Sequence, residues 1–357
     1  MNAPQLVVGR GEFPFAAMHL NHAHIHGMCH GLIEAGGELR WVFDPDADKV
    51  KAFLAAFPGT GVAASAEQVL ADPEVRLVAA AHIPNLRGEL GCRVMRAGKD
   101  YFTDKAPFTE LSQLEAARRT VAETGRKYTV YFSERLHVEC AVFAGRLIRD
   151  GVIGRVLQVV GLGPHRLSAE SRPPWFFRKR AYGGILCDIG SHQVEQFLSF
   201  AEARDARVVF ARVENYANPE HPQFEDFGEA ALVADNGAGN YFRVDWFTPD
   251  GLSVWGDGRT FILGSEGTIE LRKYVDLATA RAGEHLLLVN RQGEKRFALA
   301  GQVGFPFFGE LILDCLERTE RAMTQAHIFK AAELGLAAQA LADGLHGGHH
   351  DTAAGAV

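Results

Sequence analysis

Short apolar runs alternate with helical patterns along the first third of the chain. The run at 75–82, VRLVAAAH, is almost continuously apolar, which is typical of a strand buried on both faces of a sheet. Between such runs, apolar residues recur at helical spacing, as from Leu111 to Val121, and Gly125 then ends the pattern. The predicted strands lie at 15–20, 39–44, 75–82, 100–105 and 127–132. Strands that alternate with crossover helices predict an α/β fold with a Rossmann-like, doubly wound parallel sheet.

The pattern changes after about residue 135. One helical stretch is followed by strand signals that dominate 205–300, with a hairpin turn predicted at Asn236-Gly237. Runs of strands with few helices indicate an α+β domain with a large, mostly antiparallel sheet. We therefore expect a Rossmann-like domain, an α+β domain for substrate binding and oligomerisation whose closing helix packs back on the first, and a flexible tail. These segments are 1–134, 135–345 with the closing helix at 322–345, and 346–357.

Composition excludes several classes of protein. Hydrophobic residues make up 47% of the 357 residues and charged residues 23%, the balance of a globular protein. The net charge of -7 argues against a nucleic-acid partner. No apolar run approaches the roughly 20 residues that a membrane span needs, and the five scattered cysteines form no CxxC pair. We expect a reduced, cytoplasmic protein with no nucleic-acid or membrane partner.

The stretch MHLNHAHIHGMCH, residues 18–30, holds five of the 15 histidines. It follows the first predicted strand, where a Rossmann fold carries glycines that let the backbone approach a pyrophosphate. His19, Asn21 and His24 stand in their places. The histidines are exposed turn residues, or bind cofactor phosphates in place of glycine amides, or bind a transition metal. Because residues two apart on an extended chain point to opposite sides, we expect no convergence of the whole set and no metal ion.

Asp44 closes the second predicted strand in VFDPDAD. A carboxylate at this position accepts hydrogen bonds from an adenosine ribose and repels a 2'-phosphate, which favours NAD over NADP. A turn-forming Asp-Pro is the alternative interpretation of this residue.

Two further motifs carry candidate chemistry. In GGILCDIGSHQ, Asp188 and His192 are four residues apart on a predicted helix, so the carboxylate can orient the imidazole as a general base. In YFTDKAPF, Lys105 closes a predicted strand at its carboxyl end, where open α/β sheets bind ligands. A structural Asp–His pair and a solvated lysine are the alternatives.

A loop rich in arginine and aromatic residues runs into the Asp188 motif. Rings supply an apolar wall and guanidinium groups bind carboxylates or hydroxyls, so we expect a substrate-binding surface; packing on a domain or subunit interface is the alternative. The candidate residues, with the end of the preceding strand, are His165, Arg166, Arg172, Trp175 and Phe176.

Together, these motifs resemble the glucose–fructose oxidoreductase and inositol dehydrogenase family, Gfo/Idh/MocA. The stretch from Val75 to Pro107 resembles the family's segment ending in Glu-Lys-Pro, here Asp104-Lys105-Ala106-Pro107 with one residue inserted. GGILCDIGSHQ resembles its Gly-Gly-x-x-x-Asp-x-Gly-x-His motif, and 134–156 resembles the helix that joins its domains.

The resemblance implies a nicotinamide dinucleotide on the first domain and a sugar, polyol or cyclic hydroxylated substrate held by the second. His192 would remove the proton of the substrate hydroxyl, and Asp188 would keep the imidazole of His192 oriented. Lys105 would polarise the hydroxyl oxygen. Asp188 and His192 would also bind the substrate. The residues expected to contact the cofactor are Leu20, Asn21, His22, His24, Ile25, Asp44, Pro84, Asn85 and Lys105.

Other functions stay open at this point. The same scaffold could act as a non-redox lyase, glycosidase or epimerase, either NAD-assisted or metal-dependent with the dinucleotide site lost, or as a non-catalytic binding protein. Because a large uncovered sheet needs burial, we expect a homodimer or homotetramer formed through the C-terminal sheet, and otherwise only a small-molecule partner.

Overall fold

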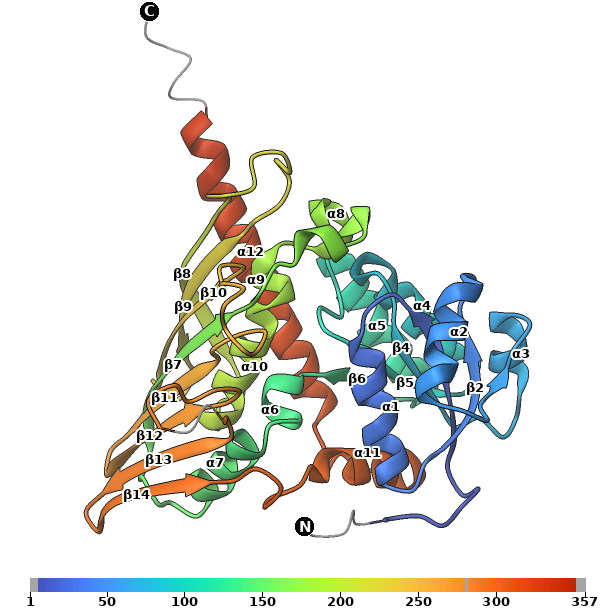
Figure 1. The fold of residues 1–357 in the computed structure, drawn as a ribbon, viewed down its shortest axis with the longest axis horizontal. Coiled ribbons are helices and arrows are strands. Elements are labelled where there is room, and N and C mark those ends of the chain that lie inside the picture. The colour runs from blue at the N-terminus through green and yellow to red at the C-terminus, as the bar shows by residue number, and fades with distance from the viewer. Residues whose placement is uncertain (1–5, 280–281, 351–357) are drawn as a thin grey trace, which may run out of the picture. The chain divides into compact units, whose positions relative to one another are not determined.

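A computed structural model describes residues 6–279 and 282–350 of the chain. The chain divides into two compact units, each described by itself. Unit 1 holds the chain up to Tyr131 together with Gly304–Phe329, and unit 2 holds Phe132–Val303 and the chain from Lys330 onward (Figure 1). Within the described ranges, no helix combines the length and apolar character needed to cross a membrane.

Unit 1 contains a six-stranded sheet in the order β3-β2-β1-β4-β5-β6, and every pair of neighbours is parallel. The strands are β1 (Pro14–Leu20), β2 (Glu38–Phe43), β3 (Gly61–Val62), β4 (Leu77–Ala81), β5 (Asp100–Asp104) and β6 (Tyr128–Tyr131). The helices are α1 (His24–Glu34), α2 (Ala47–Ala56), α3 (Ala66–Ala71), α4 (Pro84–Arg96), α5 (Leu111–Thr124) and α11 (Pro306–Glu317). The predicted doubly wound parallel sheet is confirmed.

The core of unit 1 lies around its central strands. Every residue of β4 and β5 is buried, as expected of strands covered on both faces. Helix α1 packs on α11 at Gly31, where an added Cβ would lie 2.3 Å from the Phe308 ring, so only glycine permits this approach. Elements β3, α3 and α11 were not predicted from the sequence, because they are too short or too far along the chain to extend the strand–helix alternation.

Unit 2 contains an eight-stranded sheet in the order β14-β13-β12-β11-β7-β10-β9-β8, antiparallel except for the β7–β10 pair. Its strands are β7 (Val156–Pro164), β8 (Ala206–Glu214), β9 (Phe227–Ala234), β10 (Gly239–Asp245), β11 (Arg259–Gly264), β12 (Gly267–Arg272), β13 (His285–Asn290) and β14 (Gly293–Ala298). The large, mostly antiparallel sheet is confirmed, and Asn236-Gly237 lies in the β9–β10 turn.

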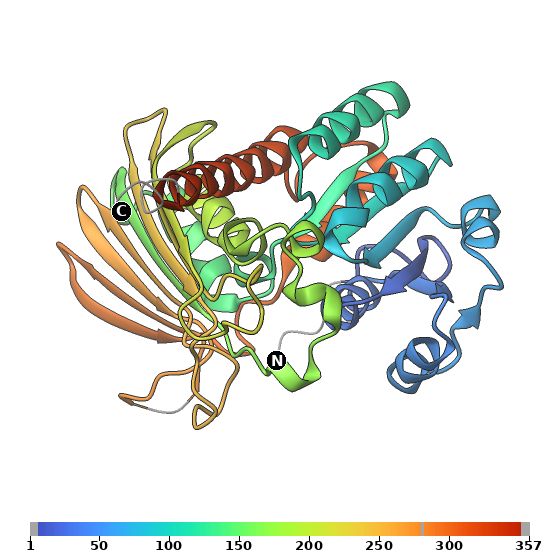
Figure 2. The ribbon, with the colours of Figure 1, turned by 90° about the horizontal axis from the view of Figure 1, so that it is seen from above.

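The helices of unit 2 gather on one face of this sheet, as Figure 2 shows. They are α6 (Ser133–Leu136), α7 (Glu139–Arg149), α8 (Lys179–Tyr182), α9 (Ile185–Asp188), α10 (Gly190–Phe200) and α12 (Gln325–His350), with the 3-10 turns η1 (Ala169–Ser171) and η2 (Pro174–Phe177). Helix α12 starts in unit 1 and extends into the predicted tail, of which 351–357 lie outside the described residues.

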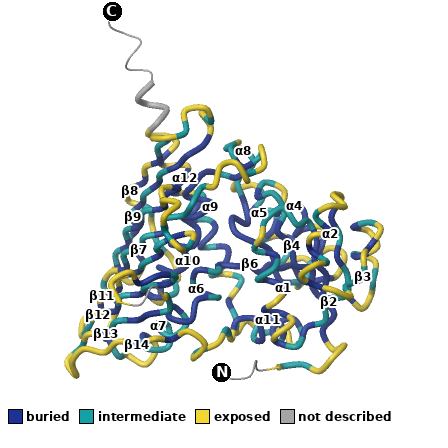
Figure 3. Tube along the Cα trace, viewed as in Figure 1, coloured by how far each residue is buried: buried dark blue, intermediate teal, exposed yellow. Residues whose placement is uncertain are grey.

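Burial along the sheet of unit 2 follows the period of two expected of strands (Figure 3). On β11, Thr260 and Ile262 face the helices and are buried, whereas Phe261 and Leu263 are exposed. One face of the sheet therefore carries apolar side chains that no helix of unit 2 covers.

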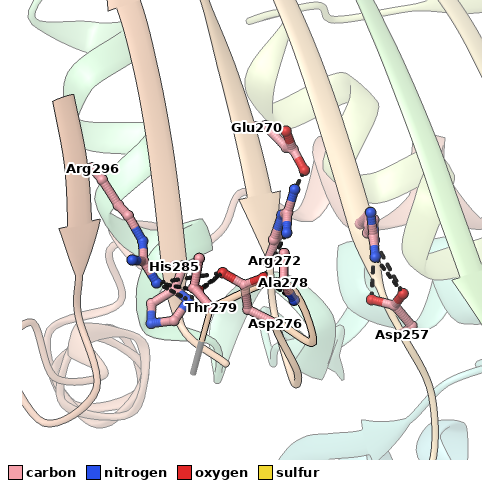
Figure 4. A network of polar contacts seen from close by, with 9 residues as sticks. Asp257, Glu270, Arg272, Asp276, Ala278, Thr279, His285 and Arg296 are labelled. Atoms are coloured by element: carbon pink, nitrogen blue, oxygen red, sulfur yellow. Dashed lines mark hydrogen bonds and ion pairs between the residues drawn. The ribbon is translucent and has the colours of Figure 1, made fainter. Parts of the chain in front are cut away.

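A polar network at the end of β12 fixes the segment that follows Lys273 (Figure 4). The buried carboxylate of Asp276 accepts hydrogen bonds from Arg272 Nη1 at 2.6 Å, Thr279 Oγ1 at 2.5 Å and the Ala278 amide at 3.2 Å. His285 Nδ1 lies 3.0 Å from the same carboxylate. These contacts tie the loop to β12 and β13.

Candidate functional site

The end of β1 has a backbone conformation that glycine usually supplies, at His19, the second-last residue of the strand. His19 has a φ of 55°, in the left-handed region, which histidine enters more readily than most residues. Asp44, directly after β2, is buried and accepts the Leu20 amide at 2.6 Å and the Asp46 amide at 2.9 Å. Asp44 thus fixes both its own turn and the turn after β1.

Side chains from the ends of β1 and β4 meet above the sheet. The His19 and His82 rings stack with centroids 4.0 Å apart, and His82 Nδ1 lies 3.1 Å from Asn21 Oδ1. Burial lowers the pKa of His19, and burial with the neighbouring His19 lowers the pKa of His82 to about 3. Both rings are therefore neutral at pH 7.

His22 and His24 converge on one carboxylate, contrary to the sequence argument. His22 Nδ1 lies 3.2 Å from Asp104 Oδ2, and His24 Nδ1 lies 2.8 Å from Asp104 Oδ1. The expectation that alternate histidines diverge assumed an extended chain, but residues 22–24 form the turn that starts α1, so the two rings project to the same side. The remaining histidines of the stretch, His26 and His30, pack on Phe57 instead.

The Asp104 carboxylate at the end of β5 is fully buried and strongly held. Arg87 Nη2 lies 3.2 Å from Oδ2, and the Lys105 amide donates to Oδ1 at 2.7 Å. Burial opposes ionisation, but His24, Arg87 and His22 outweigh it and hold the pKa of Asp104 well below its usual range. Arg87 was not predicted as a site residue, because no spacing rule links it to a residue at the end of the next strand.

The other predicted cofactor residues occupy different environments. Pro84 is buried at the start of α4, and the carbonyl of Asn85 accepts a hydrogen bond from the Gln113 side chain, Nε2, at 2.9 Å. Ile25 is buried in the core face of α1, and Leu20 is partly buried at the end of β1. Lys105 is buried, and the peptide bond that follows it is cis.

In unit 2, two glycines introduce the Asp188 motif. Gly184 has a φ of 90°, and a Cβ there would lie 2.2 Å from Gln339, so glycine is required before α9. Asp188 ends α9 and His192 lies in the first turn of α10, both buried. The Gln196 side chain donates to the His192 carbonyl at 3.0 Å, which fixes this turn.

A buried charged cluster in unit 2 interacts electrostatically with His192, and it was not predicted from the sequence. Glu134 Oε2 accepts Lys273 Nζ at 3.1 Å and the Gln193 side chain at 3.0 Å, while Lys273 also donates to Gln196 at 2.6 Å. Burial raises the pKa of Glu134, but Lys273, His192 and His165 outweigh it and hold the pKa below its ordinary value. Gln193 directly follows the motif histidine and Gln196 lies one helical turn on, a signal that could have found them; Lys273 offers none.

The predicted loop residues divide into two groups. His165 Nε2 lies 3.9 Å from Glu134 Oε1, and its ring lies 4.4 Å from Trp255, so it borders the charged cluster. Arg166 instead donates to carbonyls of the 249–254 loop, including Pro249 at 3.1 Å and Val254 at 3.0 Å. Its guanidinium serves to fasten one loop to another.

Arg172 lies over the rings of Phe176 and Trp246, at 4.5 and 5.1 Å. Burial lowers its pKa, and the charge of Asp188 partly offsets this. Phe176 is buried among aromatic rings, while Trp175 beside it is partly exposed. Phe176 and Arg172 therefore build a packed wall, and Trp175 is the ring of the pair that remains accessible.

The residues at the carboxyl edge of the unit 1 sheet fit a dinucleotide. The N-cap residue of helix α1, Ala23, makes no side-chain cap hydrogen bond, and a helix N-terminus of this kind favours phosphate. Asp44 lies at the end of β2, where a carboxylate binds an adenosine ribose, and each of its oxygens has a second lone pair. Between β1 and α1, imidazoles stand where a Rossmann fold usually carries glycines.

This fold defines a class of protein: a Rossmann-type domain joined to an α+β domain with a large open sheet. The family model described as "Oxidoreductase family, NAD-binding Rossmann fold" matches residues 5–132, and the GFO/IDH/MocA C-terminal domain matches 142–270. The chain belongs to the GFO/IDH/MocA family of oxidoreductases, and the expected membership is confirmed.

Solved structures resemble the chain over nearly its full length. A candidate oxidoreductase from Erwinia carotovora atroseptica is 56% identical, with a TM-score of 0.89, covering 92% of this chain and 98% of that one. Levoglucosan dehydrogenase in complex with NADH shares the fold at 16% identity, with a TM-score of 0.77 and coverage of 93% and 97%.

Among curated proteins, D-xylose dehydrogenase of Paenarthrobacter nicotinovorans is 28% identical over 131 residues, 35% of this chain and 34% of that protein. The uncharacterized oxidoreductase YhhX of Escherichia coli is 27% identical over 157 residues, 43% of this chain and 44% of its own length. The chain therefore matches less than half of the length of these curated relatives.

Proposed function

We propose that the protein is an NAD-dependent oxidoreductase that acts on a secondary alcohol of a sugar, polyol or cyclic hydroxylated compound. The observation that carries the proposal is the buried His192, in the family's Gly-Gly-x-x-x-Asp-x-Gly-x-His motif, beside the charged cluster of Glu134 and Lys273. Part of the chain is similar to D-xylose dehydrogenase, and nearly all of it shares the fold of levoglucosan dehydrogenase. The names of these two proteins support the proposed substrate class.

A bound nicotinamide would supply the acceptor for the hydride of the carbinol carbon. His192 would remove the proton of the same hydroxyl, because an imidazole titrates near neutral pH and accepts a proton without a large driving force. Asp188 would bind a substrate hydroxyl and orient the imidazole, and Lys105 would polarise the reacting oxygen. His165 and Trp175 would contact the rest of the substrate.

Asp44 would make NAD the preferred cofactor. Its carboxylate is fixed by the Leu20 and Asp46 amides, so it cannot turn away from a 2'-phosphate placed at the end of β2. The repulsion between the two negative charges would disfavour NADP. Pro84 and Asn85, at the start of α4, would lie beside the nicotinamide half of the cofactor.

The experiment is a titration with NADH, followed by nicotinamide fluorescence, and then turnover of NAD with a panel of aldoses, polyols and anhydrosugars at 340 nm. We expect saturable cofactor binding and absorbance change with at least one alcohol. Absence of binding at millimolar cofactor would overturn the proposal. Product formation with no net change at 340 nm would identify a lyase, glycosidase or epimerase instead.

We also propose that the protein is a cytoplasmic homo-oligomer formed through the sheet of unit 2. All five cysteines are buried and free, as suits a reducing compartment. The exposed apolar side chains on the sheet include Val209, Phe210, Phe261, Leu263 and Val289. Such a patch is stabilised when a second copy covers it.

A further inference from the structure

Three donor atoms in unit 1 have the spacing of ligands around one metal ion. His22, His24 and Asp104 each offer one atom, and these atoms lie within 4.8 Å of one another. The two Nδ1–carboxylate distances are 3.2 and 2.8 Å. In a tetrahedral site with bonds of about 2.1 Å, neighbouring ligand atoms lie roughly 3.4 Å apart, so little movement is needed to admit an ion.

We propose that His22, His24 and Asp104 form a binding site for a divalent transition-metal ion such as Zn²⁺. Imidazole and carboxylate donors suit zinc and its neighbours in the first row. The site lies outside the proposed proton-transfer chemistry, and it replaces the expectation from sequence that the protein binds no metal.

The hydrogen-bond pattern at His22 favours a cation. The amide of His24 lies 3.3 Å from His22 Nδ1, a contact that requires a lone pair on this nitrogen. A nitrogen with its lone pair directed this way cannot also donate to Asp104 Oδ2, 3.2 Å away. A metal ion bound to this lone pair and to Asp104 Oδ2 would replace the long contact with the His24 amide and would place a cation between the nitrogen and the carboxylate.

Outer contacts hold the carboxylate in place. The Lys105 amide donates to Oδ1 at 2.7 Å, and Arg87 Nη2 lies 3.2 Å from Oδ2. Carboxylates that bind metal ions are commonly held by outer hydrogen bonds of this kind. The charge of Arg87 opposes a second cation, but its guanidinium also donates to the carbonyls of His82, Lys105 and Ala106, which reduces the repulsion.

The site is open on one side. The side chains of His22 and His24 are 24% and 32% exposed, whereas Asp104 is fully buried. Three protein ligands with solvent access to a fourth position are typical of zinc that binds water or a substrate oxygen, whereas structural zinc has four protein ligands. An ion here would take one further oxygen ligand from solution.

The test measures Zn²⁺ directly in the full chain. His346, His349 and His350 are replaced by alanine in a background variant, because they form the other histidine cluster of the sequence. After dialysis against Zn²⁺, elemental analysis should find one ion per chain in both the wild type and this background. His24→Ala should then weaken Zn²⁺ binding by at least about 100-fold, since loss of an outer partner alone costs 10–100-fold.

His26→Ala is the matched control, because His26 belongs to the same stretch but packs on Phe53 and Phe57. It should leave the affinity unchanged. Substitution with Co²⁺ gives a second readout: a visible absorption band of a four-coordinate site, lost in His24→Ala while the circular dichroism spectrum is kept.

The proposal fails if the background variant binds no stoichiometric Zn²⁺, or if His22→Ala/His24→Ala binds it as tightly as the background does. NADH fluorescence, measured on the metal-free protein, tests the proposed oxidoreductase function separately. Failure of one proposal therefore leaves the other unaffected.

Discussion

Lys273 Nζ lies 3.1 Å from Glu134 Oε2, and both side chains are buried in unit 2. Lys273 comes from the segment after β12 and Glu134 from α6, 139 positions apart in the chain. The side chains of Gln193 and Gln196 also bind this pair: Gln193 donates to Glu134, and Gln196 accepts from Lys273. A buried charge pair of this kind couples the end of the sheet to the helices that carry His192.

Removing one charge of this pair should destabilise the protein strongly. Lys273→Met leaves the Glu134 carboxylate buried without its counter-charge, which costs about 3–5 kcal/mol in the free energy of unfolding. Urea unfolding measures the change. Lys295→Met, a substitution at an exposed lysine on β14, is the control and should change the free energy by less than about 0.5 kcal/mol. Equal effects of the two substitutions would contradict the assigned role of the pair.

His192→Gln should lower the turnover number by about 10²- to 10⁴-fold, because general-base catalysis supplies this range. Glutamine keeps a polar side chain of similar length but accepts no proton at neutral pH. Stopped-flow or steady-state absorbance at 340 nm measures the loss, and NADH affinity should stay within a few-fold. His30→Gln, at an exposed position of α1, should retain wild-type turnover. Full activity of His192→Gln would exclude the imidazole as the base.

Asp44→Asn should relax the preference for NAD over NADP. The amide oxygen can still accept one of the two backbone amides that Asp44 binds, while the negative charge that repels a 2'-phosphate is lost. We expect the ratio of the two dissociation constants to shift by about tenfold, equivalent to about 1.4 kcal/mol. Parallel fluorescence titrations with NADH and NADPH measure it. An unchanged ratio would show that Asp44 acts only on the turn.

The stacked pair of His19 and His82 should make the protein sensitive to acid. His82 has a folded pKa of about 3, below its unfolded value of 6.5. Below pH 6.5 the unfolded chain binds a proton that the folded chain refuses, so stability is lost as the pH falls from 6.5 towards 3. His82→Phe should therefore reduce the stability lost between pH 7 and pH 5 by about 1 kcal/mol, after a discount for partial solvent screening.

Urea unfolding of His82→Phe at the two pH values measures this difference, and phenylalanine can keep the ring contact with His19. His30→Phe is the matched control, because His30 is exposed on α1. A wild-type pH dependence in His82→Phe would show that this imidazole is not the source of the acid sensitivity.

Phe261→Glu should dissociate the proposed oligomer. Phe261 lies on the uncovered face of β11 and is 39% exposed, so a charge there disrupts a subunit interface without entering the core of unit 2. Light scattering should show a smaller molar mass for this variant at micromolar concentration. Leu111→Glu, at an exposed leucine at the start of α5, should leave the mass unchanged. A monomeric wild type would contradict the proposal.

Local patterns predicted most of the fold. The apolar run of β4, the helical spacing of α5 before Gly125 and the Asn236-Gly237 turn lie where the sequence indicated, because each depends on side chains close together in the chain. Short elements such as β3 were missed, since two residues carry no periodic signal. Helix α11 joins unit 1 although more than 170 residues separate it from β6, and no local rule reveals such a return.

The sequence by itself determined the family, the two architectures and the motif positions of Lys105, Asp188 and His192. Only the tertiary structure decided which side chains surround them. His22 and His24 meet on Asp104 because the chain turns into α1, and Glu134 meets Lys273 because the segment after β12 approaches α6. Contacts of this kind depend on the direction of side chains from separate elements, which spacing along a chain does not encode.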